Sequence, residues 1–115
     1  MALTINDDYD GAILIVRPAG RLDTTTAKSL ETHLSSHITD GQTQIVIDLA
    51  QVDYVSSYGL RVILIIAKKL MPHGQAFALC NLSENVHSVF EVSGFGKILK
   101  IKPSLGEAVS AVSTV

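Results

Sequence analysis

The sequence predicts an α/β fold in which a mixed central β-sheet of about four or five strands is flanked by about four helices. Short runs rich in Val, Ile and Leu alternate along the chain with longer segments of helical periodicity. The composition is 47% hydrophobic but only 5% aromatic, which favours an aliphatic core around a buried sheet. The length of 115 residues suits a single domain, residues 1–115.

Four short aliphatic runs are expected to form strands, because Gly, Pro or polar residues bound each of them. They are residues 12–16, 44–49, 76–80 and 98–101. The first three are nearly continuous in apolar residues, which indicates burial on both faces of the sheet. Residues 3–5 could add an edge strand, paired with residues 12–16 across the connection "NDDYDG".

Four segments with helical spacing lie between and after these runs. They are residues 26–38, 58–70, 83–93 and 104–112. Thr24 or Thr25 could cap the first helix, and Ser83 could cap the third, which Gly94 can terminate. Strands that alternate with helices imply parallel pairing through right-handed crossovers.

The segment "VDYVSSYGLRVILIIAKKL", residues 52–70, contains an apolar run that could be either a strand or a helix. Serines before the run and lysines in its last turn favour a helix. Helical spacing places one set of side chains on the core side: Leu60, Ile63, Leu64, Ala67 and Met71. The opposite side carries Arg61, Lys68 and Lys69, with Ile65 among them and Val62 beside them. These two apolar residues are either scattered surface side chains or the centre of a partner-contact patch with a basic rim.

Charge and composition argue against several classes of protein. The net charge of −2 and the lack of a long basic run disfavour direct nucleic-acid binding. The single cysteine, Cys80, lies in the apolar run "AFALC" and is expected to be a buried, unreactive thiol. The N-terminus does not resemble a signal peptide, and no apolar run could span a membrane. A soluble, cytoplasmic protein without membrane contact is expected.

Ser56 and Ser57 stand directly before the helix at residues 58–70 and allow two interpretations. One serine can cap the helix while the other is a polar loop residue. Alternatively, a hydroxyl at this position can accept a phosphate, because free N–H groups and the positive end of the helix dipole stabilise the dianion. The two interpretations are compatible.

Enzyme signatures are missing, and no catalytic residue or cofactor is expected. The sequence around Ser57 lacks the Gly-x-Ser-x-Gly nucleophile pattern, and neither Gly-x-Gly-x-x-Gly nor a P-loop occurs. His33 and His37 are four residues apart on the first helix, a spacing that can bind metal. Without a third ligand motif, they are expected to be exposed helical residues, and no metal site is expected.

Three segments together resemble the STAS-domain proteins that act as anti-sigma factor antagonists. "VDYVSSYGLRVIL" is similar to the family's Ser-containing strand-to-helix turn, "GRLDTTTA" to its Gly-x-Leu-Asp…Thr-Ala segment, and "VFEVSGFGKILKI" to its Ser-Gly…Lys-Ile segment. The matches follow in the family's order and cover nearly the whole chain. The resemblance implies a STAS fold, a β-sheet flanked by helices, and no catalysis by this chain.

The resemblance also implies partner switching. Unphosphorylated antagonists of this family bind a serine-protein kinase that doubles as an anti-sigma factor and itself binds the ATP. Phosphorylation of the antagonist releases the kinase, and a phosphatase resets the cycle. Alignment on Gly59-Leu60 places the phosphate acceptor at Ser57, with Ser56 as the alternative because its hydroxyl is also in reach.

The expected partner-binding residues surround this acceptor: Asp23, Ser56, Tyr58, Gly59, Arg61, Val62, Ile65 and Lys68. Asp23 matches an acidic position of the family near the acceptor, but it could equally be a turn or cap residue before the first helix. The chain is expected to be a monomer or a weak dimer. An alternative function is a non-switching STAS subunit of a transporter or sensory scaffold complex, which would use the same helix face without phosphorylation.

Overall fold

A mixed six-stranded sheet forms the centre of the computed structural model, which describes residues 3–74 and 76–113. The strands are β1 (Thr4–Asp10), β2 (Ile13–Leu22), β3 (Ile45–Asp48), β4 (Gln51–Val55), β5 (Phe77–Cys80) and β6 (Lys100–Lys102). They lie in the order β1-β2-β3-β5-β6, and β4 pairs with the C-terminal part of β2. The β1–β2 pairing is antiparallel and the others are parallel, so the expected mixed sheet is confirmed.

Between and after the strands, the described residues form four α-helices and two short 3₁₀ turns. They are α1 (Thr26–Thr39), α2 (Ser57–Leu70), η1 (Met71–His73), α3 (Glu84–Val92), η2 (Phe95–Lys97) and α4 (Leu105–Ser113). Each α-helix begins and ends within about one residue of its expected position, because amphipathic periodicity and capping residues mark helices well. Residues 1–2, 75 and 114–115 of the expected single domain lie outside the described residues.

The first two strands are longer than expected. β1 occupies most of "NDDYDG", which was expected to be a connection, and pairs with β2 from Thr4↔Ala19 to Asp10↔Ile13. β2 continues through Pro18, although proline has no N–H to donate. The N–H of Leu14 points to the β3 side, where it donates to Gln44 O. Pro18 lies four residues later and faces the same side. It stands between the stretch of β2 that pairs with β3 and the stretch that pairs with β4, so its missing N–H falls in a gap of the pairing.

The sequence prediction missed β4 and misplaced β6. In β4, both Val52 and Val55 are buried, and two exposed residues separate them, so the strand lacks the usual alternation. A register shift in its pairing with β2 accounts for this spacing. At β6, the expected strand at residues 98–101 begins two residues later, since Ile98 follows η2 and is 68% exposed.

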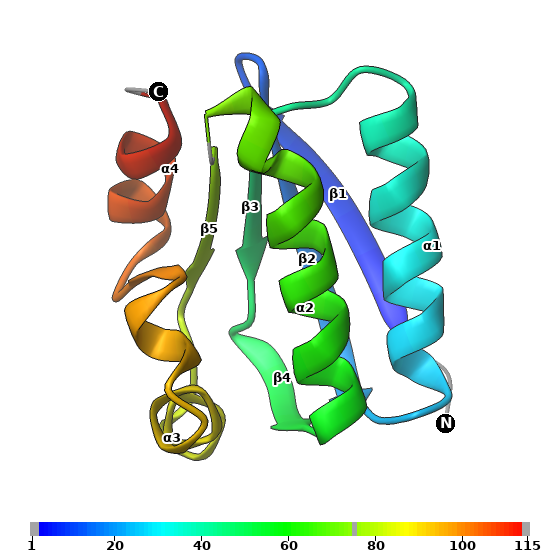
Figure 1. Cartoon of the computed structure of the whole chain (residues 1–115), viewed down its shortest axis with the longest axis vertical. Coiled ribbons are helices and arrows are strands. Elements are labelled where there is room, and N and C mark those ends of the chain that lie inside the picture. Colours follow the sequence, from blue (N-terminus) through cyan, green and yellow to red (C-terminus); the bar gives the residue numbers. More distant parts are fainter. Residues whose placement is uncertain (1–2, 75, 114–115) are drawn as a thin grey trace.

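The two faces of the sheet carry separate clusters of buried side chains. Leu14 and Val16 of β2 belong to the larger cluster, which includes side chains of α1, α2 and α3. Ile13 and Ile15 belong to the smaller one, which Ala108 and Val112 of α4 complete. Figure 1 shows α1 and α2 side by side over the sheet. The alternation along β2 therefore explains why its apolar run is continuous.

The C-terminal ends of β2 and β4 lie side by side. Leu22 pairs with Val55, and the N–H of Ser56 donates to Leu22 O at 2.8 Å. Figure 1 shows that α1 and α2 both begin at this end of the sheet. Residues just after the two strands are thereby brought together although more than 30 positions separate them in the chain.

Candidate functional site

Ser56 is the N-cap of α2. Its backbone is extended, with φ −80° and ψ 172°, and its Oγ accepts a hydrogen bond from the N–H of Gly59 at 3.1 Å. Its carbonyl oxygen accepts from the N–H of Leu60 at 2.9 Å, the first hydrogen bond of the helix. The Ser56 hydroxyl is therefore engaged in starting the helix.

Ser57 is the first residue of α2 and is exposed. Within the described part of the chain, its hydroxyl has no hydrogen-bond partner, in contrast to that of Ser56. The positive end of the α2 dipole lies here, where an anion is stabilised. The exposed hydroxyl of Ser57 thus stands where an added phosphate would meet favourable electrostatics and no steric obstruction from the core.

Gly59 allows the start of α2 to approach the ends of β2 and β4 closely. A Cβ at this position would lie 2.8 Å from Leu22 O, 3.1 Å from Leu22 Cβ and 3.2 Å from Val55 Cγ1. Gly59 is itself buried. Sequence reasoning placed it among the partner-binding residues, but its surroundings show that it is a packing residue that supports the serines.

The buried face of α2 is broader than helical spacing alone suggested. Lys69 Nζ donates to Ser35 Oγ of α1 at 2.9 Å, so α1 covers the side of α2 that bears Lys69. Val62 lies two turns earlier on this side and is fully buried, which corrects its expected role in partner contact. The core-facing residues are Gly59, Leu60, Val62, Ile63, Ile66 and Leu70.

The core-facing set expected from the sequence is thereby partly wrong. Leu64 and Ala67 are only partly buried, and Met71 is 52% exposed. These three residues instead line a groove of about 420 Å³ with Phe95 and Ile98. The helix is rotated relative to the expected phase because it packs against both the sheet and α1.

The exposed side of α2 is basic. Arg61 and Lys68 are exposed, and they follow Ser57 by four and eleven residues, so the three share one side of the helix. Ile65 and Tyr58 are partly buried and lie outside the two buried clusters. No acidic residue occurs in α2, so the surface around Ser57 combines two cations with partly exposed apolar side chains.

Asp23 starts α1. Its Oδ1 accepts hydrogen bonds from the N–H groups of Thr25 and Thr26 at 3.0 Å each, while its own N–H donates to Thr26 Oγ1 at 3.0 Å. The hydrogen bond from the N–H of Thr26 is the main cause that lowers the pKa of Asp23 below its ordinary value. Thr25, one of the two residues expected to cap α1, makes no side-chain cap, and the capping interpretation of Asp23 is the one that these contacts support.

Sequence reasoning did not identify an aromatic–cation pair at the same end of the sheet. Arg21 and Tyr54 are register partners on β2 and β4, and the guanidinium carbon lies 4.1 Å from the centre of the ring. Both residues are exposed. Because the pair exists only through β4, no local sequence pattern could have indicated it.

The remaining residues that the sequence singled out are accounted for by their contacts. Cys80 is fully buried, and burial, with the nearby Asp48 carboxylate, raises the pKa of its thiol to about 12, as expected for an unreactive thiol. The expectation that His33 and His37 are exposed is wrong, because both are half-buried and hydrogen-bond to Asp7.

Among the described residues, no helix is both long and apolar enough to cross a membrane.

Comparison with known proteins agrees with this architecture. Residues 4–108 match the model of the STAS domain. A protein of Bordetella bronchiseptica, BtrV, provisionally named an anti-sigma factor antagonist, is 39% identical over 99% of this chain and 97% of its own. The anti-sigma F factor antagonist of Paenibacillus polymyxa is 30% identical over 100% of this chain and 99% of its own.

Solved structures show the same fold. The unphosphorylated anti-sigma factor antagonist SpoIIAA superposes with a TM-score of 0.81 at 22% identity and covers 97% of this chain and 98% of its own. The phosphorylated form of SpoIIAA from Bacillus superposes with a TM-score of 0.72 at 22% identity, over 95% of this chain and 99% of its own. With these matches over nearly its full length, the chain belongs to the STAS-domain family, and its relatives are named anti-sigma factor antagonists.

Proposed function

We propose that this protein is an anti-sigma factor antagonist that works by partner switching. In its unphosphorylated form it binds a serine-protein kinase that also acts as an anti-sigma factor. Phosphorylation of Ser57 by that kinase causes the complex to dissociate. A phosphatase restores the binding form. The names of the relatives support this proposal, and SpoIIAA, which shares the fold, is known in phosphorylated and unphosphorylated forms.

The observation that carries the proposal is the difference between the two hydroxyls. Ser56 Oγ is bound to the N–H of Gly59, whereas Ser57 is exposed at the first position of the helix. A phosphate on Ser57 would add a charge of about −2 beside the positive end of α2, so the helix would tolerate it. A phosphate on Ser56 would instead disturb the cap.

The proposed contact surface follows from the exposed side of α2. It comprises Ser57, Tyr58, Arg61, Ile65 and Lys68, with Asp23 at the neighbouring start of α1. Partly buried Ile65 and Tyr58 would provide apolar contact, and Arg61 and Lys68 would pair with acidic groups of the partner. A doubly charged phosphate in this surface would lose its hydration water when the partner binds, and no matching cation on the partner would replace it. This cost would explain why the kinase is released after phosphorylation.

The chain itself contributes no catalysis in this proposal. The kinase binds the ATP, and the antagonist acts in the cytoplasm as a monomer or weak dimer, without contacting nucleic acid or membrane. Control of the sigma factor is thus exerted through protein–protein contact alone.

Incubation with the cognate kinase and ATP, followed by phosphopeptide mapping, tests the acceptor. We expect phosphate on Ser57 in the unmodified chain and in Ser56→Ala, and none in Ser57→Ala. Phosphate found on Ser56 alone would contradict the assignment. Stable binding of a partner without any phosphorylation would point to a non-switching STAS subunit of a transporter or sensory scaffold.

The contact surface has its own test. Ile65→Glu is expected to abolish kinase binding in calorimetry, because it places a carboxylate in an apolar contact, while the melting temperature changes little. Ile66→Glu, one residue further along and fully buried, should instead unfold the protein. A large loss of stability in Ile65→Glu would show that this side chain belongs to the core.

A further inference from the structure

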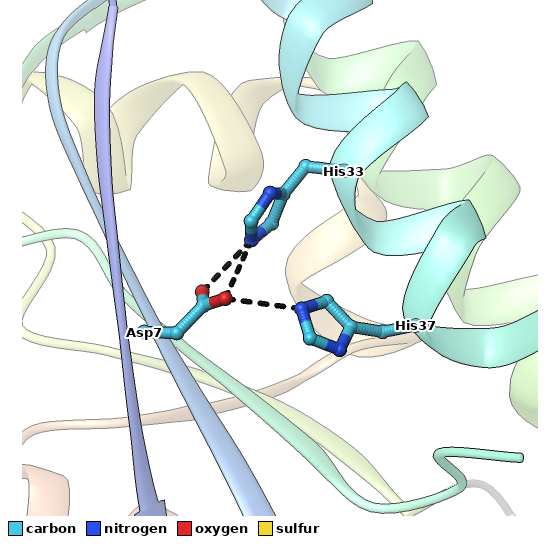
Figure 2. Close-up of side chains that lie close together, drawn as sticks. All are labelled: Asp7, His33 and His37. Carbon is cyan, nitrogen blue, oxygen red and sulfur yellow. Dashed lines mark hydrogen bonds and ion pairs between the residues drawn. The ribbon is translucent and has the colours of Figure 1, made fainter. Parts of the chain in front are cut away.

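Three side chains that commonly bind metals meet between β1 and α1, away from the proposed contact surface on α2. Figure 2 shows Asp7 of β1 facing His33 and His37 of α1. The two oxygens of the Asp7 carboxylate lie 2.8 and 2.9 Å from His33 Nε2, and one of them lies 3.0 Å from His37 Nε2. Residues separated by 26 and 30 positions in the chain therefore converge on one point.

Asp7 occupies an unusual position for an acidic residue. It pairs with Val16, whose side chain lies in the larger buried cluster, and paired residues share a face of the sheet. Ile5, two residues earlier on this face, packs against the same cluster. Asp7 is an exposed residue of the edge strand, but its side chain is directed toward α1 and is 26% exposed.

The two histidines are held in a geometry suited to a shared ligand. They lie four residues apart on α1, one turn above the other, and their rings meet edge to face with centroids 5.0 Å apart. Leu34 between them is fully buried and fixes the rotation of α1. Both rings direct Nε2 at the carboxylate, so all three groups are presented by regular secondary structure.

We propose that Asp7, His33 and His37 bind a divalent transition-metal ion, with Zn²⁺ as the best fit. Two imidazoles and one carboxylate form a common zinc donor set, and a water molecule can complete the tetrahedron. With metal–ligand bonds of about 2.0–2.2 Å, the ligand atoms of a tetrahedral site lie roughly 3.4 Å apart.

The donor atoms are already close to this arrangement. The His–Asp contacts are 2.8–3.0 Å, and one ligand atom from each residue lies within 4.8 Å of the other two. Small side-chain rotations would therefore admit the ion. Mg²⁺ and Ca²⁺ prefer oxygen ligands and are poor candidates. The single thiol, that of Cys80, is buried and does not compete for the ion.

The bound ion would join the edge strand β1 to α1. Because the unfolded chain does not hold these three side chains together, the ion binds the folded form and raises its melting temperature. In the metal-free protein, the same cluster is a hydrogen-bonded contact between the two elements.

Titration of untagged, chelator-treated protein with ZnCl₂ in calorimetry at about pH 7.5 tests the site, because neutral imidazoles are needed to bind the ion. We expect one Zn²⁺ per chain and a higher melting temperature. His37→Ala and Asp7→Asn should each weaken binding at least about tenfold, since losing a direct ligand costs no less than losing a supporting residue. His87→Ala is the matched control, because His87 Nδ1 pairs with Glu91 on α3 at 3.4 Å and, among the described residues, His87 belongs to no group of three possible metal ligands. Equal loss in the control, or unchanged binding in both ligand variants, would overturn the proposal.

A second measurement uses the unmodified chain and does not depend on folding of the variants. Zn²⁺ should shift the imidazole NMR signals of His33 and His37 and leave those of His73 and His87 in place. Shifts confined to His73 or His87, or no saturable shift, would exclude the site.

Discussion

At the scale of single residues, two neighbouring hydroxyls have different surroundings. Ser56 Oγ accepts a hydrogen bond from the N–H of Gly59 and caps the helix, whereas Ser57, one residue later, faces solvent. The hydroxyl that caps α2 is therefore not the hydroxyl that faces solvent. Under the proposed switch, a phosphate on Ser57 would leave the hydrogen bond between Ser56 Oγ and the N–H of Gly59 in place.

Loss of the cap and loss of the proposed acceptor should have different effects on stability. Ser56→Ala is expected to lower the free energy of unfolding by about 1 kcal/mol, because it leaves the N–H of Gly59 unpaired. Ser57→Ala, its matched control, should stay within about 0.5 kcal/mol of the unmodified protein. Urea denaturation measures both, and equal losses would show that the two serines share the cap.

A charge at Ser57 should weaken binding of the proposed kinase. Ser57→Asp is expected to cost roughly 2–5 kcal/mol of binding free energy, because the carboxylate is buried at the contact without a mate. Ser57→Asn has nearly the same shape without the charge and should bind more tightly than Ser57→Asp. Calorimetry with the kinase compares them, and identical affinities would argue against an electrostatic switch.

At the scale of secondary-structure elements, the position of α2 depends on a close contact with the ends of two strands. Gly59 has no side chain, so the first turn of α2 can rest against Leu22 and Val55. This contact places the serines beside the start of α1, where Asp23 provides the cap. Two helix starts thus meet at one end of the sheet.

Gly59→Ala should destabilise the protein by roughly 1–3 kcal/mol, because its Cβ would overlap Leu22 O, a backbone atom that cannot move aside easily. Gly106→Ala in α4 is the matched control. A Cβ there meets no atom within 4 Å, and alanine is the better helix former, so stability should rise by about 0.5–1 kcal/mol. Thermal unfolding distinguishes the two, and a neutral Gly59→Ala would show that α2 can shift away from the strands.

The cap of α1 should make stability depend on pH in acid. The pKa of Asp23 is lowered from its ordinary value of 3.8, so its contribution is fully present above about pH 4 and is lost as the pH falls through the lower folded value. Asp23→Asn keeps an acceptor oxygen but does not titrate. The stability difference between the two proteins, measured by urea denaturation from pH 7 to pH 3, should shrink below about pH 4. A constant difference would show that the charge of Asp23 does not contribute.

At the scale of the whole molecule, one sheet serves two hydrophobic cores. Neighbouring residues of β2 point into opposite clusters, Leu14 toward α1 and α2, and Ile15 toward α4. Neither core can therefore be lost without disturbing the strands that build the other. This shared construction favours a single cooperative unfolding transition.

Leu14→Ala and Ile15→Ala test this coupling from the two faces of one strand. Each should cost roughly 2–5 kcal/mol, the usual loss for a large aliphatic side chain in a core. Both substitutions should shift a single unfolding transition to lower urea concentration. Circular dichroism and hydrogen exchange would monitor that transition. Separate transitions for α4 and for α1 and α2 would show that the cores unfold independently.

Local patterns were sufficient to predict the helices and the inner strands. Leu30 and Leu34 of α1 lie on one side through helical spacing, and the aliphatic runs of β3 and β5 are buried at every position. Prediction was wrong where a second element decides burial. Val62 was expected to be a surface residue because the position of α1 beside α2 is not encoded in the spacing of α2 itself.

The sequence by itself determined the alternating elements, the STAS resemblance and the pair of serines at the start of a helix. Only the tertiary structure decided which serine caps that helix, that β4 pairs Tyr54 with Arg21, and that Asp7 meets two histidines. The first set follows from chain-local periodicity and capping chemistry. The second depends on distances between segments far apart in the chain, which are set by how helices and strands pack together.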